Sequence, residues 1–128
     1  INAPRLVELD FSFNNFTRTM PPNLGSLKGL ARFTVTHNLL RTVEAEGFSF
    51  LTSLTNCSNL QDLDIGLNRF KGELPTSIAN FSTTLQQLIA GANQISGTIP
   101  EGIKNLIGLT WLVISMNSIT GEIPVGIG

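Results

Sequence analysis

Apolar residues recur along the chain in a fixed order that leads to an asparagine. The order is clearest between Leu106 and Pro124, where it reads LxxLxxLxLxxNxLxGxIP. The same frame places asparagine at five positions, Asn14, Asn38, Asn68, Asn93 and Asn117, at intervals of 24, 30, 25 and 24 residues. We number the corresponding units copies 1 to 5. Self-similarity at such a period predicts a fold built from stacked copies.

The apolar part of each copy predicts a short β-strand. Alternate side chains of a strand point to the same side, so the apolar residues point into the coil and the intervening ones face outward. The predicted strands are Leu9–Phe11, Phe33–Val35, Leu63–Ile65, Leu88–Ala90 and Leu112–Ile114. Stacking places them in one parallel sheet with strands about 4.8 Å apart. Because one copy cannot bury its own apolar side, stability depends on neighbouring copies.

The five asparagines, which we call the ladder asparagines, stand where the chain turns away from a predicted strand. Each amide can satisfy backbone groups of its own and the neighbouring copy that would otherwise be buried without partners. Replacing one should therefore cost about 1 to 3 kcal/mol of stability.

Three copies share an ending that the first two lack. Gly72, Gly97 and Gly121 stand four residues after the ladder asparagines of copies 3, 4 and 5, and an apolar residue and proline follow each. Arg18 and Thr42 hold the glycine position in copies 1 and 2. Glycine permits an open turn and proline fixes φ, so the local geometry should differ between the two groups.

Composition excludes several classes of function. Only 13% of the 128 residues are charged and the formal charge is −1, so no basic surface argues for nucleic acid. No run of about 18 apolar residues and no leader segment occurs, so we expect no membrane contact by this segment. Residues 1–128 are expected to form one solenoid of five leucine-rich copies without capping repeats. We expect an internal slice of a longer array, with core exposed at both ends and any targeting, anchoring or catalytic segment outside it.

Side chains with catalytic chemistry are few and scattered. His37 is the single histidine, and no serine or cysteine stands at a predictable triad position. Asp62 and Asp64 alternate on one strand face, but no metal-ligand cluster accompanies them. Cys57 holds a leucine position of copy 3 and is expected to be a small buried side chain, while Ser82 holds the same position in copy 4. The sequence predicts no enzymatic activity, no metal and no cofactor.

The Gly-x-Ile-Pro ending resembles the plant-type extracellular leucine-rich repeat. The resemblance rests on the segments 72–75, 97–100 and 121–124 and covers nearly the whole chain. It implies an α/β solenoid with a parallel sheet on the concave face and short helices or 3-10 turns on the convex face. It also implies a second layer of short strands at the Gly-x-Ile-Pro segments.

Copy 2 is six residues longer than the 24-residue unit, and its sequence narrows the resemblance. Its segment Glu46–Leu60, which contains FLTSLTNCS, is similar to the plant receptor-like kinase subfamily that includes the bacterial elongation-factor receptor and the rice bacterial-blight resistance receptor. In that subfamily a membrane span and a kinase domain follow the repeats. From the residues alone, Ser49 can cap a helix with Phe50 and Leu54 on one face, so the extra residues lengthen a convex helix. A partner-binding loop is the alternative.

Three sequences have the form Asn-x-Ser/Thr that N-glycosylation requires. They begin at Asn15, Asn56 and Asn80, all outside the predicted strands. Three in so short a chain favour an extracellular glycoprotein; the alternative is that they are ordinary turn residues.

The outward positions of the predicted strands form the candidate ligand-binding surface. They stand six and four residues before each ladder asparagine. The candidate residues are Glu8, Asp10, Arg32, Asp62, Asp64, Gln87, Ile89, Trp111 and Val113. Copies 1 to 3 are acidic around Arg32, which favours a basic peptide, although exposed ion pairs are worth under about 1 kcal/mol each. In the apolar copies 4 and 5, Trp111 is the candidate anchor, unless a neighbouring side chain or glycan covers it.

Two functions fit these observations. The first is a recognition segment of a plant cell-surface leucine-rich repeat receptor kinase, in immune or developmental signalling, which binds a peptide or protein ligand or a co-receptor ectodomain outside the plasma membrane. The second is a secreted leucine-rich repeat inhibitor or wall-associated protein with no signalling domain. The coding sequence beyond Gly128 discriminates them: a membrane span with kinase motifs identifies the receptor, and a stop codon after a cysteine-containing cap identifies the inhibitor.

Overall fold

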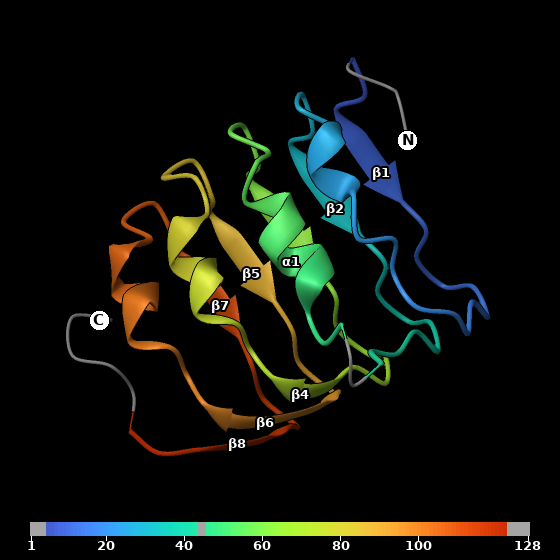
Figure 1. The fold of residues 1–128 in the computed structure, drawn as a ribbon, viewed down its shortest axis with the longest axis vertical. Helices are drawn as coiled ribbons and strands as arrows, with labels where there is room; N and C mark the ends of the chain where they lie inside the picture. The colour runs from blue at the N-terminus through green and yellow to red at the C-terminus, as the bar shows by residue number, and fades with distance from the viewer. Residues whose placement is uncertain (1–4, 44–45, 123–128) are drawn as a thin grey trace.

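Five short strands form one parallel sheet along the concave side of the molecule. The computed structural model describes residues 5–43 and 46–122. The strands are β1 (Glu8–Asp10), β2 (Arg32–Thr34), β3 (Asp62–Asp64), β5 (Gln87–Ile89) and β7 (Trp111–Val113). They lie in the order β1-β2-β3-β5-β7, and each neighbouring pair is parallel. Figure 1 shows them following one another from the blue β1 to the red β7.

The strands begin one residue earlier than the apolar pattern predicts. β7 covers 111–113, whereas the pattern predicts 112–114. Hydrogen bonding between copies nevertheless continues past the assigned strand ends, since the Val35 N–H donates to Asp64 O at 3.0 Å. The predicted and observed strands therefore describe the same pairing with slightly different bounds.

A second parallel sheet lies where the chain has turned past the ladder asparagines, in the lower part of Figure 1. Its strands are β4 (Lys71–Glu73), β6 (Gln94–Thr98) and β8 (Ser118–Thr120). Gly72, Gly97 and Gly121 have φ of +107°, +76° and +83°, a region where other L-residues are strained. The second strand layer implied by the resemblance is thus present in copies 3, 4 and 5.

In the described part of copies 1 and 2, no strand occupies the equivalent position. A hydroxyl in copy 2 takes over part of the pairing instead. Thr42 Oγ1 donates to Lys71 O at 2.6 Å and accepts from Lys71 N–H at 3.0 Å. One side chain therefore satisfies backbone groups at the edge of β4 that a preceding strand would otherwise pair.

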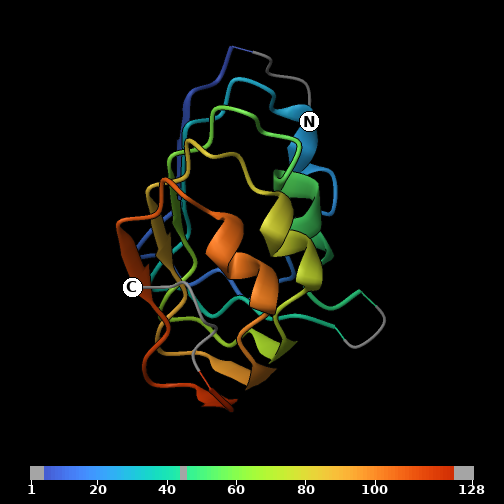
Figure 2. The same ribbon diagram turned by 90° about the vertical axis from the view of Figure 1, so that its left-hand side faces the viewer.

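Short helical segments cover the convex side. They are the 3-10 helices η1 (Leu24–Ser26), η2 (Thr76–Asn80) and η3 (Glu101–Asn105), and the α-helix α1 (Ser49–Leu54). Figure 2 shows them in a row on the side away from the five-stranded sheet. Among the described elements, the backbone of each helical segment lies near only the helical segments of adjacent copies, as stacking of repeats requires.

The start of α1 corrects the predicted cap. Ser49 is the first helical residue, Phe48 holds the cap position, and no side chain makes a capping hydrogen bond. The reason is a turn before the helix, in which the Ser49 N–H donates to Glu46 O at 3.0 Å. The predicted apolar face is confirmed, because Phe50 and Leu54 are both buried.

The extra residues of copy 2 are shared between the helix and the segments on either side of it. α1 begins eleven positions after its ladder asparagine, whereas η2 and η3 begin eight positions after theirs. Three of the six extra residues therefore precede the helix. Compared with η3, α1 is one residue longer and the segment between it and the next strand is two residues longer, so the predicted lengthening of the convex helix accounts for one of the six extra residues. Glu44 and Ala45 lie outside the described residues.

Copy 4 compensates for its missing leucine within the core. Phe81, one residue before Ser82, is buried at the position that leucine holds elsewhere. Its N–H donates to Ile78 O at 3.2 Å and closes η2, as the Leu106 N–H closes η3 on Ile103 O at 3.1 Å. The interval of 25 residues between ladder asparagines accommodates this shift by one position.

Candidate functional site

The ladder asparagines hold neighbouring copies in register. Asn68 is 8% exposed, and its Nδ2 donates to the carbonyl oxygens of Val35, Ile65 and Gly66 at 3.0, 3.2 and 2.9 Å. Its Oδ1 accepts the Leu40 N–H at 3.1 Å. Since Val35 and Leu40 belong to copy 2, one amide serves two copies. Equivalent bonds recur at the ladder asparagines of copies 2, 4 and 5.

The residue before each ladder asparagine has a left-handed backbone. We call these five residues the shoulder column: Phe13, His37, Leu67, Ala92 and Met116, with φ of 57°, 58°, 53°, 54° and 57°. This conformation costs about 1 to 2 kcal/mol for a residue other than glycine. Sequence reasoning did not single out these positions. Their constant offset from the ladder asparagines is the signal by which they could have been found.

The candidate ligand-binding residues lie in two columns across the five-stranded sheet. The first column consists of Glu8, Arg32, Asp62, Gln87 and Trp111. The second consists of Asp10, Thr34, Asp64, Ile89 and Val113. The sheet thus brings all nine candidates onto one surface, as the offsets predict. Whether they bind a ligand stays a prediction.

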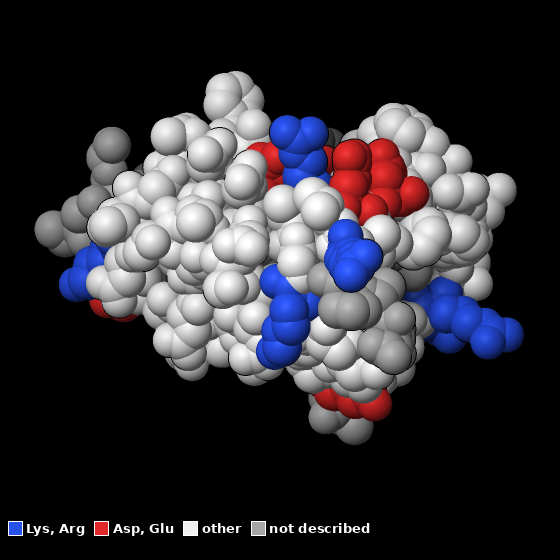
Figure 3. All heavy atoms as spheres, turned by 90° about the horizontal axis from the view of Figure 1, so that it is seen from above, with Lys and Arg blue, Asp and Glu red and all other residues white. Residues whose placement is uncertain are grey.

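The acidic half of this surface contains one ion pair across adjacent strands. Arg32 Nε lies 3.1 Å from Asp62 Oδ2, and both side chains remain partly exposed. Such a pair is worth under about 1 kcal/mol. A shallow hollow of about 210 Å³ lies here, with Glu8, Asp64 and Ile89 also in its lining. Figure 3 shows acidic side chains gathered beside a basic one on a largely uncharged surface.

Two carboxylates of the second column differ in pKa although their local turns match. Burial raises the pKa of Asp64, against the opposing influence of the Gly66 N–H, which donates to Oδ1 at 2.9 Å, and of nearby His37. Hydrogen bonds from Ser12 lower the pKa of Asp10, whose Oδ1 accepts the Ser12 N–H at 2.9 Å. Burial by neighbouring copies therefore moves the pKa of Asp64 away from that of Asp10.

Copies 4 and 5 supply the apolar half of the surface. Trp111 is 59% exposed, which confirms its predicted outward position. It lies in register with Gln87, while Ile89 and Val113 beside them are partly exposed. A large exposed aromatic side chain next to aliphatic ones is typical of anchors in protein interfaces.

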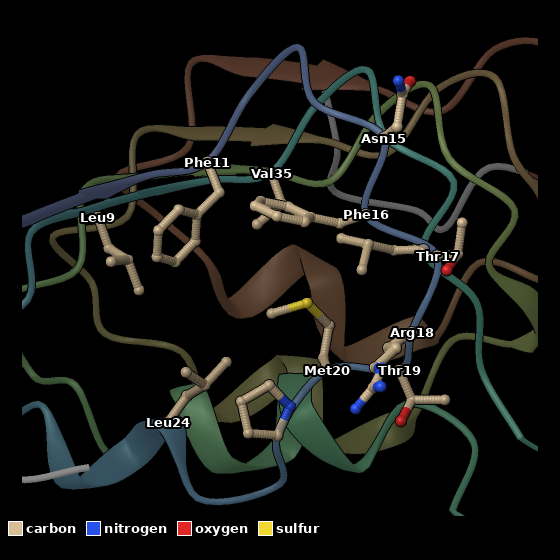
Figure 4. A pocket seen from close by; sticks show the side chains of 12 residues that line it. Leu9, Phe11, Asn15, Phe16, Thr17, Arg18, Thr19, Met20, Leu24 and Val35 are labelled. Atoms are coloured by element: carbon tan, nitrogen blue, oxygen red, sulfur yellow. The ribbon is translucent and has the colours of Figure 1, made fainter.

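A larger hollow of about 410 Å³ opens in copy 1. Figure 4 shows Phe11, Phe16 and Met20 pointing into it, with Leu9 and Leu24 on its other sides. The rings of Phe11 and Phe16 meet edge to face with centroids 5.8 Å apart. All five residues hold core positions of the repeat. We therefore assign this hollow to the core of copy 1 and not to a polar ligand site.

The three glycosylation sequences are accessible. Asn15, Asn56 and Asn80 are exposed and lie outside the strands. Asn80 is the last residue of η2, and Asn56 follows the end of α1. Attachment of a glycan to any of them stays a prediction.

Within the described residues, no three His, Cys, Asp or Glu side chains are grouped so that they could hold a metal ion. Cys57 is buried as predicted, its Sγ donates to Leu27 O at 3.3 Å, and burial raises the pKa of its thiol. His37 is exposed and stacks on Phe13 with ring centroids 4.3 Å apart. Over the same part of the chain, no helix is long and apolar enough to cross a membrane.

Comparison with known sequences gives the same repeat frame. The leucine-rich repeat family model matches residues 5–27, 59–81, 84–106 and 108–128. The chain is 40% identical over 104 residues to Receptor kinase-like protein Xa21 of Oryza sativa subsp. japonica, and 42% identical over 102 residues to LRR receptor-like serine/threonine-protein kinase EFR of Arabidopsis thaliana. These matches cover 81% and 80% of this chain, which spans only 8% of the length of each relative.

Solved receptor structures share the fold. The structure of PEPR1-AtPEP1 gives a TM-score of 0.84 at 31% identity and covers 95% of this chain and 16% of that one. The structure of the Arabidopsis receptor kinase HAESA, in complex with the peptide hormone IDA and the co-receptor SERK1, gives a TM-score of 0.78 at 28% identity. That match covers 92% of this chain and 19% of that one. The matched region consists of repeats, and the kinase domain of the relatives lies elsewhere. This chain belongs to the leucine-rich repeat family, and its relatives are the plant receptor kinases that its copy 2 resembles.

Proposed function

We propose that this chain is a ligand-recognition segment of a plant cell-surface leucine-rich repeat receptor kinase. The observation that carries the proposal is the concave sheet, whose outward columns align in register over five copies. Side chains from adjacent strands form one continuous surface, charged in copies 1 to 3 and apolar in copies 4 and 5. Such a surface suits a peptide or protein ligand that contacts several copies at once.

The comparisons support this class of partner. PEPR1 is seen with AtPEP1, and HAESA with a peptide hormone and a co-receptor. For this chain we propose a peptide or protein ligand, with a co-receptor ectodomain as a second partner, in immune or developmental signalling. The proposed location is the extracellular side of the plasma membrane, within a single-pass receptor, which suits the three exposed glycosylation sequences.

Truncation of Trp111 tests the proposed surface. The probe is a peptide recovered from a phage-displayed library of random 12-residue peptides by selection on the purified chain. Trp111→Ala should weaken its binding by about 2 kcal/mol or more, as for truncated interface anchors. Thermal stability should change little, because the side chain is exposed. Ile107→Ala, which truncates an 81% exposed residue away from the concave strands, should leave the affinity unchanged.

Equal affinity of the Trp111→Ala variant would remove this residue from the site, and failure to recover any peptide would argue against peptide recognition. The coding sequence beyond Gly128 tests the receptor assignment separately. We expect a membrane span followed by kinase motifs. A stop codon after a cysteine-containing cap would instead identify a secreted inhibitor or wall-associated protein.

A further inference from the structure

The shoulder column presents apolar side chains to solvent beside the concave sheet. Phe13 is 73% exposed, Leu67 44% and Met116 79%. His37, also exposed, stacks on Phe13 with an interplanar angle of 17°, so the first members form a continuous surface. Leu67 has a described copy on each side, and its exposure therefore persists within the stack.

Folding does not account for the residue types of the shoulder column. Its left-handed backbone favours Gly, Asn, Asp or His, yet four of the five residues, Phe13, Leu67, Ala92 and Met116, are of other types. Burial does not account for the apolar members either, since Phe13 and Leu67 expose much of their side chains. Strained backbone combined with exposed apolar side chains points to a binding role.

The neighbouring column of the sheet supplies the charge that defines the occupant. Asp10 and Asp64 each stand three residues before the shoulder residue of their copy, Phe13 or Leu67. His37 is near enough to Asp64 to influence its titration. Apolar side chains and carboxylates three residues apart in the same copies are together complementary to a ligand with apolar and basic side chains. Copies 1 to 3 span about 10 Å of sheet, which three or four residues of an extended peptide cover.

We propose that the shoulder column of copies 1 to 3, together with Asp10 and Asp64, binds an extended peptide. An apolar side chain of the peptide contacts Phe13, His37 and Leu67, and a basic side chain pairs with the carboxylates. This proposal rests on the proposed recognition function and assigns it a surface distinct from Trp111. It predicts that Lys or Arg, close to an apolar residue, recurs among peptides selected on the chain.

Leu67→Asn separates binding from folding at this position. Asn tolerates the left-handed backbone, so the melting temperature should stay the same or rise. The probe is the strongest-binding 12-residue peptide selected from a random phage-displayed library on the unglycosylated chain. Its dissociation constant should increase about tenfold or more, on the scale of interface hot spots. The control Ile107→Asn, an equal change at an exposed apolar residue outside the column, should leave the dissociation constant unchanged.

The double variant Asp10→Asn, Asp64→Asn tests the basic contact. Asparagine keeps the Oδ1 acceptor for Ser12 N–H and Gly66 N–H, so the local turns remain. Binding of the same peptide should weaken several-fold and lose much of its dependence on salt. Glu73→Gln in β4, which removes an exposed charge from the other sheet, is the matched control and should have no effect.

The outcomes separate this proposal from the function on which it rests. A selected peptide that binds the Leu67→Asn variant and the double aspartate variant at full affinity would overturn the proposal, while peptide recognition would stand. A selection that yields no peptide would count against both. Self-association of the chain that Leu67→Asn abolishes, measured by sedimentation, would identify a second copy as the occupant and would also overturn the proposal.

Discussion

Copies 1 and 2 differ from copies 3 to 5 in how the chain leaves the concave sheet. The later copies add the strands β4, β6 and β8 at a glycine with positive φ. In the described part of the earlier copies the equivalent strand is lacking, with Arg18 and Thr42 at that position. The five-stranded sheet runs through both groups without a break. Stacking therefore does not need the second sheet, which is an addition that requires glycine.

The largest difference in stability loss is expected between substitutions of Phe70 and Phe16, which stand two residues after the ladder asparagines of copies 3 and 1. Phe70 is fully buried, whereas Phe16 is 47% exposed. Phe70→Ala should lower the free energy of unfolding by about 3 to 5 kcal/mol, and Phe16→Ala by about 1 kcal/mol or less. Urea unfolding measures both. Equal losses would show that copy 1 is packed as tightly as copy 3.

The ladder asparagines should show the next largest contrast. Asn68 bonds to two copies, whereas Asn14 is exposed and, among the described residues, donates only to Phe11 O and Ser12 O of its own copy. Asn68→Ala should cost about 2 to 3 kcal/mol and Asn14→Ala about 1 kcal/mol or less. If chemical denaturation gave the two variants the same stability, the bonds between copies would add nothing.

Glycine in the second sheet should have a smaller effect. Gly97→Ala forces alanine into a φ of +76° and should cost about 1 kcal/mol. Arg18→Ala, at the same position of copy 1, should stay within about 0.5 kcal/mol. Thermal melting of the two variants provides the measurement. An unchanged melting temperature of the Gly97→Ala variant would mean that the glycine is dispensable for this turn.

The smallest effect on stability is expected from Asp10 and Asp64, the equivalent carboxylates of copies 1 and 3. The raised pKa of Asp64 means that its protonation stabilises the folded chain below its ordinary value of 3.8, and that this contribution is lost as pH rises through the folded pKa. Asp10, with a lowered pKa, has the opposite sign: its contribution is present above 3.8 and lost as pH falls through the folded pKa.

Between acid and neutral pH, Asp64 makes the folded chain less stable as pH rises, and Asp64→Asn should abolish this decrease. Asp10 makes it more stable as pH rises, and Asp10→Asn should abolish that increase. Unfolding curves recorded from pH 3 to pH 7 against the unaltered chain give the sign of each. The quantity to compare is the free energy of unfolding of each variant minus that of the unaltered chain, plotted against pH. If this difference had a slope of the same sign for both variants, the assigned difference in burial would be contradicted.

Much of the site surface could be predicted, because offsets from the ladder asparagines translate directly into columns. Trp111 and Asp64 lie where the count places them. The same count gives the positions of the shoulder column, but not its left-handed backbone or the exposure of Leu67, which follow from the turn and the packing around it. Ser49 failed as a cap for a related reason: the turn before α1 places it one residue inside the helix, past the cap position.

The sequence by itself determined the stacking of copies, the parallel concave sheet and the place of each ladder asparagine, because periodic burial leaves one arrangement that covers every apolar stripe. Only the tertiary structure decided how the exceptions were resolved. Phe81 replaces a leucine, the Thr42 hydroxyl replaces backbone pairing, and Asp64 becomes partly buried while Asp10 does not. The last two outcomes depend on atoms of a neighbouring copy, which the frame within one copy does not specify.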